Sequence, residues 1–93
     1  MSLLKSKASE MDSNEKRVAN ISIVVREKKS VQVVNEILSR HGEVIRGRLG
    51  IPYPERGISI IIILIDADNS RIGAISGFLG NVPGVTLRST ILI

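Results

Sequence analysis

The run ISIIIILI, residues 58–65, constrains the fold most strongly, because every residue in it except Ser59 is apolar. As a helix, the run would span roughly 12 Å, far less than the ~30 Å hydrocarbon core of a bilayer. As a strand, it would extend about 26 Å. Isoleucine fills most of the run, and its β-branched side chain favours strands. We therefore predict a strand that follows Gly57 and ends at Asp66.

Both faces of this predicted strand are apolar. One face carries Ile58, Ile60, Ile62 and Leu64, and the other carries Ser59, Ile61, Ile63 and Ile65. A strand with one solvated face alternates between apolar and polar residues, so this run belongs inside a sheet with cover on each side. We expect one face to pack on the helices of the chain and the other to need a further cover.

Three more strands and two helices are expected around the isoleucine strand. Alternation predicts strands over residues 18–25, 43–49 and 85–93, and helical spacing predicts helices over 30–42 and 70–80. Ser30 is the expected N-cap of the first helix, and Asp68 or Asn69 that of the second. The segment 50–57, rich in proline and glycine, is expected to be a loop.

This order predicts an α+β fold: a ferredoxin-like βαββαβ sandwich, with a four-stranded antiparallel sheet and both helices on one face. The domain would occupy residues 17–93, and the polar segment 1–16 would be a flexible extension. Regular pleating would place an apolar row on the helix-free face, flanked by polar and arginine side chains. The row is Ile61, Ile63 and Ile65, and its flanks are Asn20, Ser22, Arg46, Arg48, Thr86, Arg88 and Thr90. We weigh a partly solvated surface against an interface between subunits, and favour the interface, with Arg88 at its side.

Composition excludes several classes of function. The 93 residues make one domain, and a chain this short buries only about 60% of its unfolded surface, so association would help it. With no cysteine there is no disulfide, which fits a cytoplasmic protein.

The net charge of +4 is spread along the chain and does not indicate nucleic-acid binding. An RNA-binding domain of this layout stacks bases on aromatic residues of its central strands, and here those strands have none.

A few polar and small residues are candidates for a site. His41, near the end of the first helix, has a structural role in our interpretation, because one histidine cannot bind a metal alone. Asp66 and Asp68 are either a helix cap, which we favour, or a divalent-ion site. Gly73 and Gly77 are expected to pack closely against the sheet or another subunit. The loop 50–57 is either a rigid connector or the seal of a ligand pocket between subunits, alongside Arg46 and Arg48.

Four segments of the sequence carry a family resemblance: VNEIL at 34–38, GRLGIPYPERG at 47–57, IGAISGFLG at 72–80 and PGVTL at 83–87. With them, the chain from Arg17 to Ile93 resembles the iron-only hydrogenase system regulators. These are ACT-like proteins, related in fold to the C-terminal domain of the nickel-responsive repressor. The resemblance implies a homo-oligomeric sensor or adaptor with a ferredoxin-like domain. The glycine that ACT domains use between the first strand and first helix is missing here, as are the histidines and cysteine of the nickel site.

The sequence therefore predicts a regulatory protein and not an enzyme, with no cofactor, no metal and no membrane contact. The partners expected are a second copy, in a dimer or tetramer, and a small-molecule effector. The proposed ligand-binding residues are Arg46, Arg48, Pro52, Tyr53 and Arg56. The alternative is a structural or protein-interaction subunit without a ligand, in contact with hydrogenase assembly proteins or a transcription factor.

Overall fold

The computed structural model describes residues 15–93, and within them the strands and helices follow in the predicted order. The strands are β1 (Arg17–Val25), β2 (Ile45–Tyr53), β3 (Ile58–Ala67) and β4 (Val85–Ile91), and the helices are α2 (Ser30–Arg40) and α3 (Asn69–Gly80). The short 3-10 helices η1 (Gly42–Val44) and η2 (Pro54–Arg56) flank β2. The extension predicted over residues 1–16 lies, except for its last two residues, outside the described residues.

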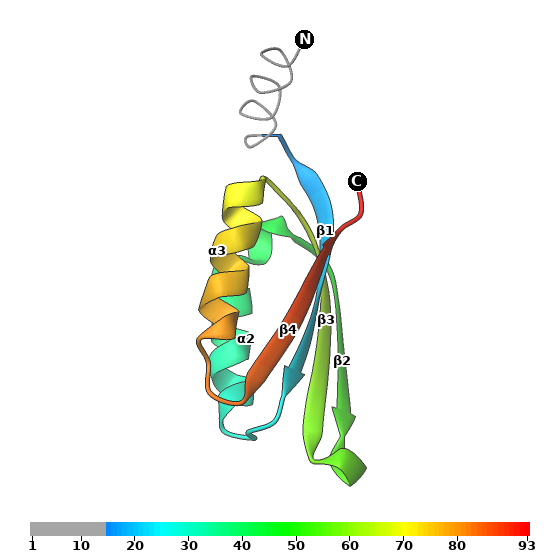
Figure 1. Ribbon diagram of the computed structural model, residues 1–93, viewed down its shortest axis with the longest axis vertical. Coiled ribbons are helices and arrows are strands. Elements are labelled where there is room, and N and C mark those ends of the chain that lie inside the picture. Colours follow the sequence, from blue (N-terminus) through cyan, green and yellow to red (C-terminus); the bar gives the residue numbers. More distant parts are fainter. Residues whose placement is uncertain (1–14) are drawn as a thin grey trace.

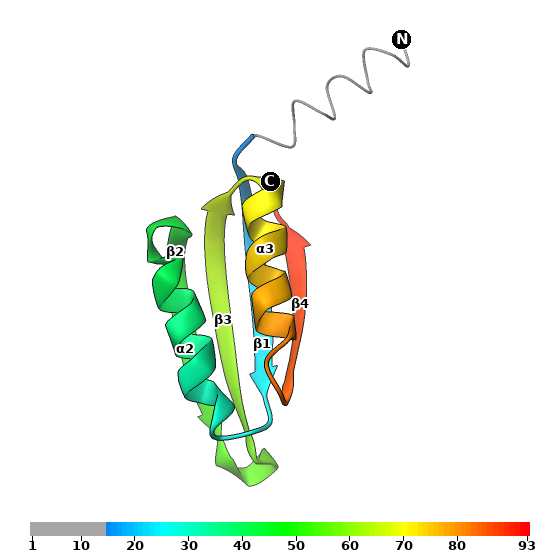
Figure 2. The ribbon, with the colours of Figure 1, turned by 90° about the vertical axis from the view of Figure 1, so that its left-hand side faces the viewer.

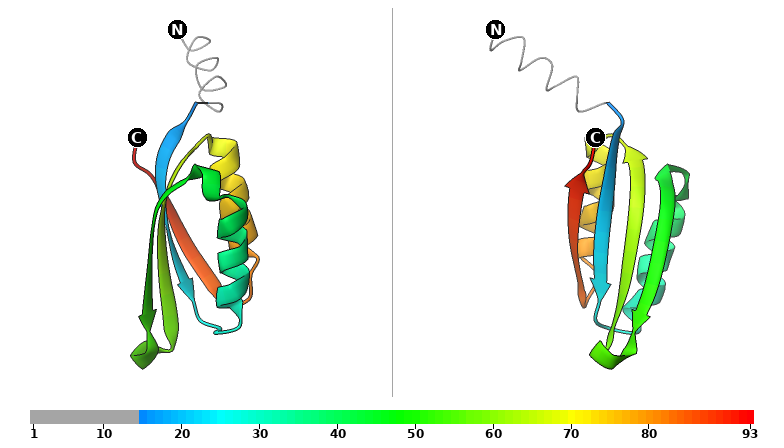
Figure 3. Two further views of the ribbon diagram at one scale, coloured as in Figure 1. Left: turned by 180° about the vertical axis from the view of Figure 1, so that it is seen from behind. Right: turned by 90° about the vertical axis from the view of Figure 1, so that its right-hand side faces the viewer.

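The four strands form one antiparallel sheet in the order β2-β3-β1-β4. Within residues 15–93, both helices cover the same face of this sheet, and the other face carries no helix (Figure 1 and Figure 3). Seen through the helix layer, α2 lies on the β2 side of the sheet and α3 on the β4 side (Figure 2). The predicted ferredoxin-like α+β fold is confirmed, with the isoleucine strand β3 in an inner position.

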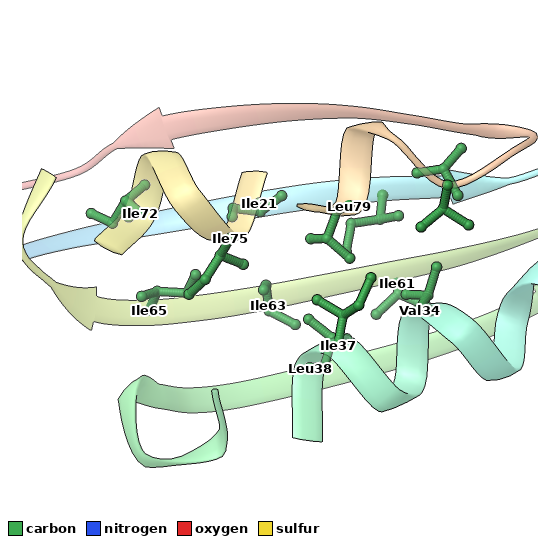
Figure 4. Packing of buried hydrophobic residues seen from close by; sticks show 14 of the residues in the cluster. Ile21, Val34, Ile37, Leu38, Ile61, Ile63, Ile65, Ile72, Ile75 and Leu79 are labelled. Carbon is green, nitrogen blue, oxygen red and sulfur yellow. The ribbon is translucent and has the colours of Figure 1, made fainter. Parts of the chain in front are cut away.

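The core lies between the sheet and the helices (Figure 4). Ile61, Ile63 and Ile65 of β3 belong to it, and their exposed fractions are 4%, 1% and 0%. Helix residues of the same core are Val34, Ile37, Leu38, Ile72, Ile75 and Leu79. The prediction that Ile61, Ile63 and Ile65 form an interface on the helix-free face is therefore wrong.

The pairing of β1 with β3 explains this error. Ile21 pairs with Ile63, whereas Ser22 pairs with Ile62. The polar residues of β1 therefore share a face with the even-numbered residues of β3. A register change of one residue moves every side chain of a strand to the other face. Because β3 is apolar on both faces, its own pattern could not reveal which face the helices cover.

The second strand is longer than predicted, because β2 continues to Tyr53 instead of ending at Leu49. Residues 50–53 are therefore strand and not loop. Pro52 is tolerated there because β2 is an edge strand, where a missing N–H need not break the hydrogen-bond ladder. The remaining turn consists of η2 and Gly57, whose φ of 65° suits glycine.

A bulge near the start of β2 changes which side chains face the helices. The register shifts between Ile45 and Gly47, so Arg46 is an extra residue that β3 does not match. After the bulge, Arg48 pairs with the core residue Ile63 and lies on the helix side. Its Nη2 donates a hydrogen bond to the side-chain oxygen of Asn35 on α2. The prediction that Arg48 flanks the helix-free face is therefore wrong.

The start of α2 is held by the turn before β4. Ser30 was expected to be the N-cap, but Lys29 occupies that position and Ser30 is the first residue of the helix. The Ser30 hydroxyl donates instead to the carbonyl oxygen of Pro83, at 2.8 Å. Ser30 is buried, so this hydrogen bond satisfies a hydroxyl that has lost its access to water.

The same turn approaches the loop between β1 and α2 very closely. The backbone N–H of Arg26 donates to the carbonyl oxygen of Gly84 at 2.8 Å. Gly84 has a φ of 75°, and a Cβ on it would lie 2.7 Å from Glu27 Cγ and 3.1 Å from Glu27 N. Both the backbone conformation and the contact therefore require glycine at position 84.

Helix α3 begins at a side-chain cap. The Oδ1 atom of Asp68 accepts a hydrogen bond from the backbone N–H of Arg71 at 2.8 Å, which confirms the predicted cap. Gly73 and Gly77 are exposed, and a Cβ on either would meet no atom within 4 Å. The expectation that they pack against the sheet is therefore wrong, and their packing against another subunit stays a prediction.

Arg71 also joins α3 to the segment that follows α2. Its Nε donates to Nδ1 of His41 at 3.0 Å, and its Nη2 makes an ion pair with the carboxylate of Glu43. His41 is the C-cap residue of α2, and its ring stacks on Phe78 of α3 with 6.0 Å between ring centroids. These contacts give His41 a structural role, as predicted.

Replacing Arg71 with alanine is expected to raise the pKa of Glu43. The hydrogen bond from Arg71 holds this pKa below its ordinary value by favouring the charged carboxylate. The pair therefore adds stability above the unfolded-state pKa of Glu43, and that stability is lost as pH falls through the lower folded-state pKa. A titration of the Glu43 carboxyl carbon by NMR measures the change. Arg40→Ala is the control, and an unchanged Glu43 pKa in Arg71→Ala would contradict the assignment.

Candidate functional site

The hairpin of β2 and β3 projects beyond the helix layer at the end where β1 turns into α2 (Figure 1 and Figure 3). A cleft of about 410 Å³ opens there between the hairpin and the loop that follows β1. Its lining residues are Val25, Arg26, Lys28, Pro52, Tyr53, Pro54, Gly57, Ile58 and Ser59. This volume falls within the range of roughly 300–1,000 Å³ that is usual for small-molecule sites.

The cleft has an apolar wall and a cationic wall. The hairpin contributes two prolines, Ile58 and the Tyr53 ring, and the loop contributes Arg26 and Lys28. Among the described residues, no acidic side chain lines the cleft. Glu27, between the two cations in sequence, packs beside Gly84 instead. The cleft therefore combines apolar surface with uncompensated positive charge.

The cationic side chains are free to meet an anion. Arg26 donates one hydrogen bond through Nη1, to Thr86 Oγ1 at 2.8 Å, which fixes the guanidinium near β4. Within residues 15–93, the ion pair of Arg71 is the only one. Arg26 and Lys28 therefore have no carboxylate partner in the described part of the chain.

The structure gathers only part of the predicted ligand-binding set. Pro52 and Tyr53 line the cleft, and Arg56 lies 5.9 Å from the centroid of the Tyr53 ring. Arg46 and Arg48 do not line it. Arg48 instead borders a smaller hollow of about 190 Å³ beside α2.

Sequence reasoning missed Arg26 and Lys28 as site residues. The sequence alone marks residues 26–29 only as a charged segment between a predicted strand and a predicted helix. The pairing of Val25 with Ser59, and of Ser59 with Pro52, places the end of β1 beside the hairpin. That register is set by the whole sheet, so no local pattern around residue 26 could have revealed it.

A second surface feature is the helix-free face of the sheet. Most of its apolar residues lie on β2 and β3, and we call this group the apolar sheet patch: Leu49, Ile51, Ile58, Ile60, Ile62 and Leu64. Apart from Val18 and Val24, the β1 and β4 side of the same face is polar, with Asn20, Ser22, Thr86, Arg88 and Thr90. Of the predicted interface residues, only Arg88 therefore lies on this face.

The apolar sheet patch is neither flat nor fully solvated. Leu49 exposes 54% of its surface and Leu64 36%, while Ile62 between them is half-buried. A hollow of about 340 Å³ lies over these three residues, bordered by Asn20 and Leu92. The patch also reaches the cleft, because Ile58 belongs to both and pairs with the cleft residue Tyr53.

Residues 15–93 contain no group of three or more histidine, aspartate or glutamate side chains arranged to hold a metal ion. Asp66 and Asp68 therefore have no third partner in the described chain, and Asp68 is already the cap of α3. No helix in this part of the chain is long and apolar enough to cross a membrane.

The family-model match and the solved-structure match both relate this chain to the protein TM1266. A family model described as "TM1266-like: Iron-only hydrogenase system regulator, putative" matches residues 17–89. The solved structure of the uncharacterized protein TM1266 from Thermotoga maritima is 39% identical, with a TM-score of 0.81. The match covers 85% of this chain and 100% of that one. A comparison with curated proteins finds no match. The family name describes a regulator, and this chain belongs to the TM1266-like family of iron-only hydrogenase system regulators.

Proposed function

We propose that this chain is a homo-oligomeric regulatory module that responds to a small molecule and acts in an iron-only hydrogenase system. The observation that carries the proposal is the uncovered apolar sheet patch, which extends to the rim of a cation-lined cleft. The patch supplies a surface for association, and the cleft supplies a site for an effector. The family name supports the regulatory role and the system in which it acts.

A second copy of the chain is the partner that fits the patch best. The patch contains no charged side chain, so its partner needs an apolar, uncharged and sheet-like surface. The same patch on another copy meets these needs in a symmetric, two-fold contact. The charged residues near this face include Arg88 on β4, Asp66 at the end of β3 and Arg26, which contacts Thr86. They lie outside the patch, where they would remain at the rim.

Replacing Leu64 or Leu49 with lysine is expected to shift the protein toward monomer, by at least about ten-fold in the dissociation constant, because association would bury an unpaired charge. Light scattering coupled to size-exclusion chromatography measures the mass across a dilution series. The control is Val33→Lys, because Val33 is an exposed apolar residue on α2, outside the patch. Circular dichroism checks that each variant is folded.

The mass of the wild-type protein shows whether it is a monomer, a dimer or a tetramer. A dimer or tetramer that Leu64→Lys dissociates and Val33→Lys leaves intact would support association through the patch. A wild-type monomer at all concentrations would contradict it, as would equal effects of the two variants. Native mass spectrometry of the same sample tests sensing, since a retained small molecule adds mass. An intact oligomer that binds no small molecule would be an adaptor without a ligand.

A further inference from the structure

We infer that the cleft between the β1–α2 loop and the β2–β3 hairpin binds a small organic carboxylate with a compact apolar body. This inference rests on the proposed sensing function and names the chemical class of the effector. Three features of the cleft carry it: the unpaired cations, the apolar wall opposite them and the limited volume.

The cations select a carboxylate headgroup. Arg26 lines the cleft without a carboxylate partner in residues 15–93, and the guanidinium donors that Thr86 does not engage match the geometry of a carboxylate. Lys28 adds a second positive charge from the same wall. An anion would gain from both charges, whereas a neutral ligand would gain nothing from them and a cation would be repelled. The headgroup is therefore an anion.

The opposite wall selects the rest of the molecule. Pro52, Pro54, Ile58 and the Tyr53 ring offer apolar contacts but few hydrogen bonds. A highly hydroxylated or strongly charged body would lose its hydration there without replacement. The Ser59 hydroxyl is the one side-chain group on the β3 side that can donate or accept a hydrogen bond. An inorganic anion would use the cations and leave the apolar wall empty.

Arg56 lies over the Tyr53 ring at the hairpin. Its guanidinium lies 5.9 Å from the Tyr53 centroid, within the range of a cation–π contact. This contact favours one orientation of the ring, which forms part of the apolar wall. Arg56 is thus a positioning residue and does not line the cleft itself.

The test uses three probes on the full chain: phenylacetate, its neutral analogue phenylacetamide, and inorganic phosphate. Backbone amide NMR spectra follow each titration at constant pH and ionic strength. We expect phenylacetate to shift the amide signals of residues 25–28 and 57–59. Phenylacetamide and phosphate should each bind at least about ten-fold more weakly, because each lacks one of the two recognition elements.

Lys28→Ala and Arg26→Ala should each weaken phenylacetate binding about ten-fold, by removing a charge-assisted contact. Lys28 is exposed, so its variant is expected to fold even if the Arg26 variant, which loses the Thr86 contact, does not. Arg40→Ala is the matched control, because Arg40 is an exposed cation on α2 outside the cleft. It should leave the affinity unchanged.

Three results would overturn the inference: equal binding of phenylacetate and phenylacetamide, shifts confined to residues outside the cleft, or unchanged affinity in Lys28→Ala. Light scattering on the same samples separates this failure from failure of the proposed oligomer. If the protein is an oligomer that does not bind phenylacetate, only the proposed ligand class is wrong. A monomer that binds phenylacetate in the cleft would remove the homo-oligomer and keep the site.

Discussion

Replacing Ile63 with alanine is expected to lower the free energy of unfolding by about 2–5 kcal/mol, the usual loss for a buried isoleucine. Ile63 exposes only 1% of its surface and packs beneath both helices, so the shortened side chain leaves a cavity that the core can fill only in part. Urea unfolding followed by far-ultraviolet circular dichroism measures the loss. A domain of this size has little stability to spare, so the variant should unfold at markedly lower urea.

Ile62 provides the matched control, because it is the neighbouring isoleucine on the opposite face of the same strand. Ile62→Ala should cost less than half as much as Ile63→Ala at the same protein concentration, since Ile62 is only half-buried within the chain. Equal losses in the two variants would mean that both faces of β3 are equally covered. In the Leu64→Lys background, where the proposed association cannot cover Ile62, that result would contradict the observed assignment of the two faces.

Replacing Gly84 with alanine is expected to destabilise the fold by about 1–3 kcal/mol from backbone strain alone, because its φ of 75° is unfavourable for any residue with a Cβ. The added methyl group would also lie 2.7 Å from Glu27 Cγ, so the loop after β1 would have to move. Thermal unfolding by circular dichroism measures the loss. The hydrogen bond from Arg26 N to Gly84 O should weaken as well, which faster amide hydrogen exchange at Arg26 would report.

Gly57 separates the two causes of this loss. Its φ is 65°, close to that of Gly84, but a Cβ on it would meet no atom within 4 Å. Gly57→Ala therefore introduces backbone strain but no close contact, and it should destabilise the protein less than Gly84→Ala does. If the two variants were equally unstable, the close approach of Glu27 to Gly84 would contribute nothing.

The fold could be predicted from the sequence because its signals are local and agree with one another. Alternation in β1, helical spacing in both helices and the cap at Asp68 each define an element without reference to the others. Their order then leaves few topologies. The face of β3 that the helices cover is different, since it depends on pairing with β1, and a strand that is apolar on both sides fits either choice. The bulge at Arg46 also depends on strand pairing, here of β2 with β3, so the sequence of β2 alone could not reveal it.

The candidate site was predictable only in its hairpin half. Two prolines and the lone tyrosine marked residues 52–54 as unusual, and the structure places these residues in the cleft. Arg26 and Lys28 reach it because β1 ends beside the hairpin, a consequence of long-range strand pairing. Arg48 carries the same charge, but the hydrogen bond to Asn35 holds it beside α2. Charge alone therefore did not identify the cationic wall.

The pair Tyr53 and Ile58 joins the two surfaces described above, since both residues line the cleft and Ile58 also belongs to the apolar sheet patch. Two binding equilibria are coupled when each changes the affinity of the other, and shared side chains give these two surfaces a physical means of such coupling. If association changes the affinity of the cleft for a ligand by some factor, the ligand changes the association constant by the same factor. Under the two proposals above, the end of the β2–β3 hairpin would link the concentration of a metabolite to the assembly state of the protein.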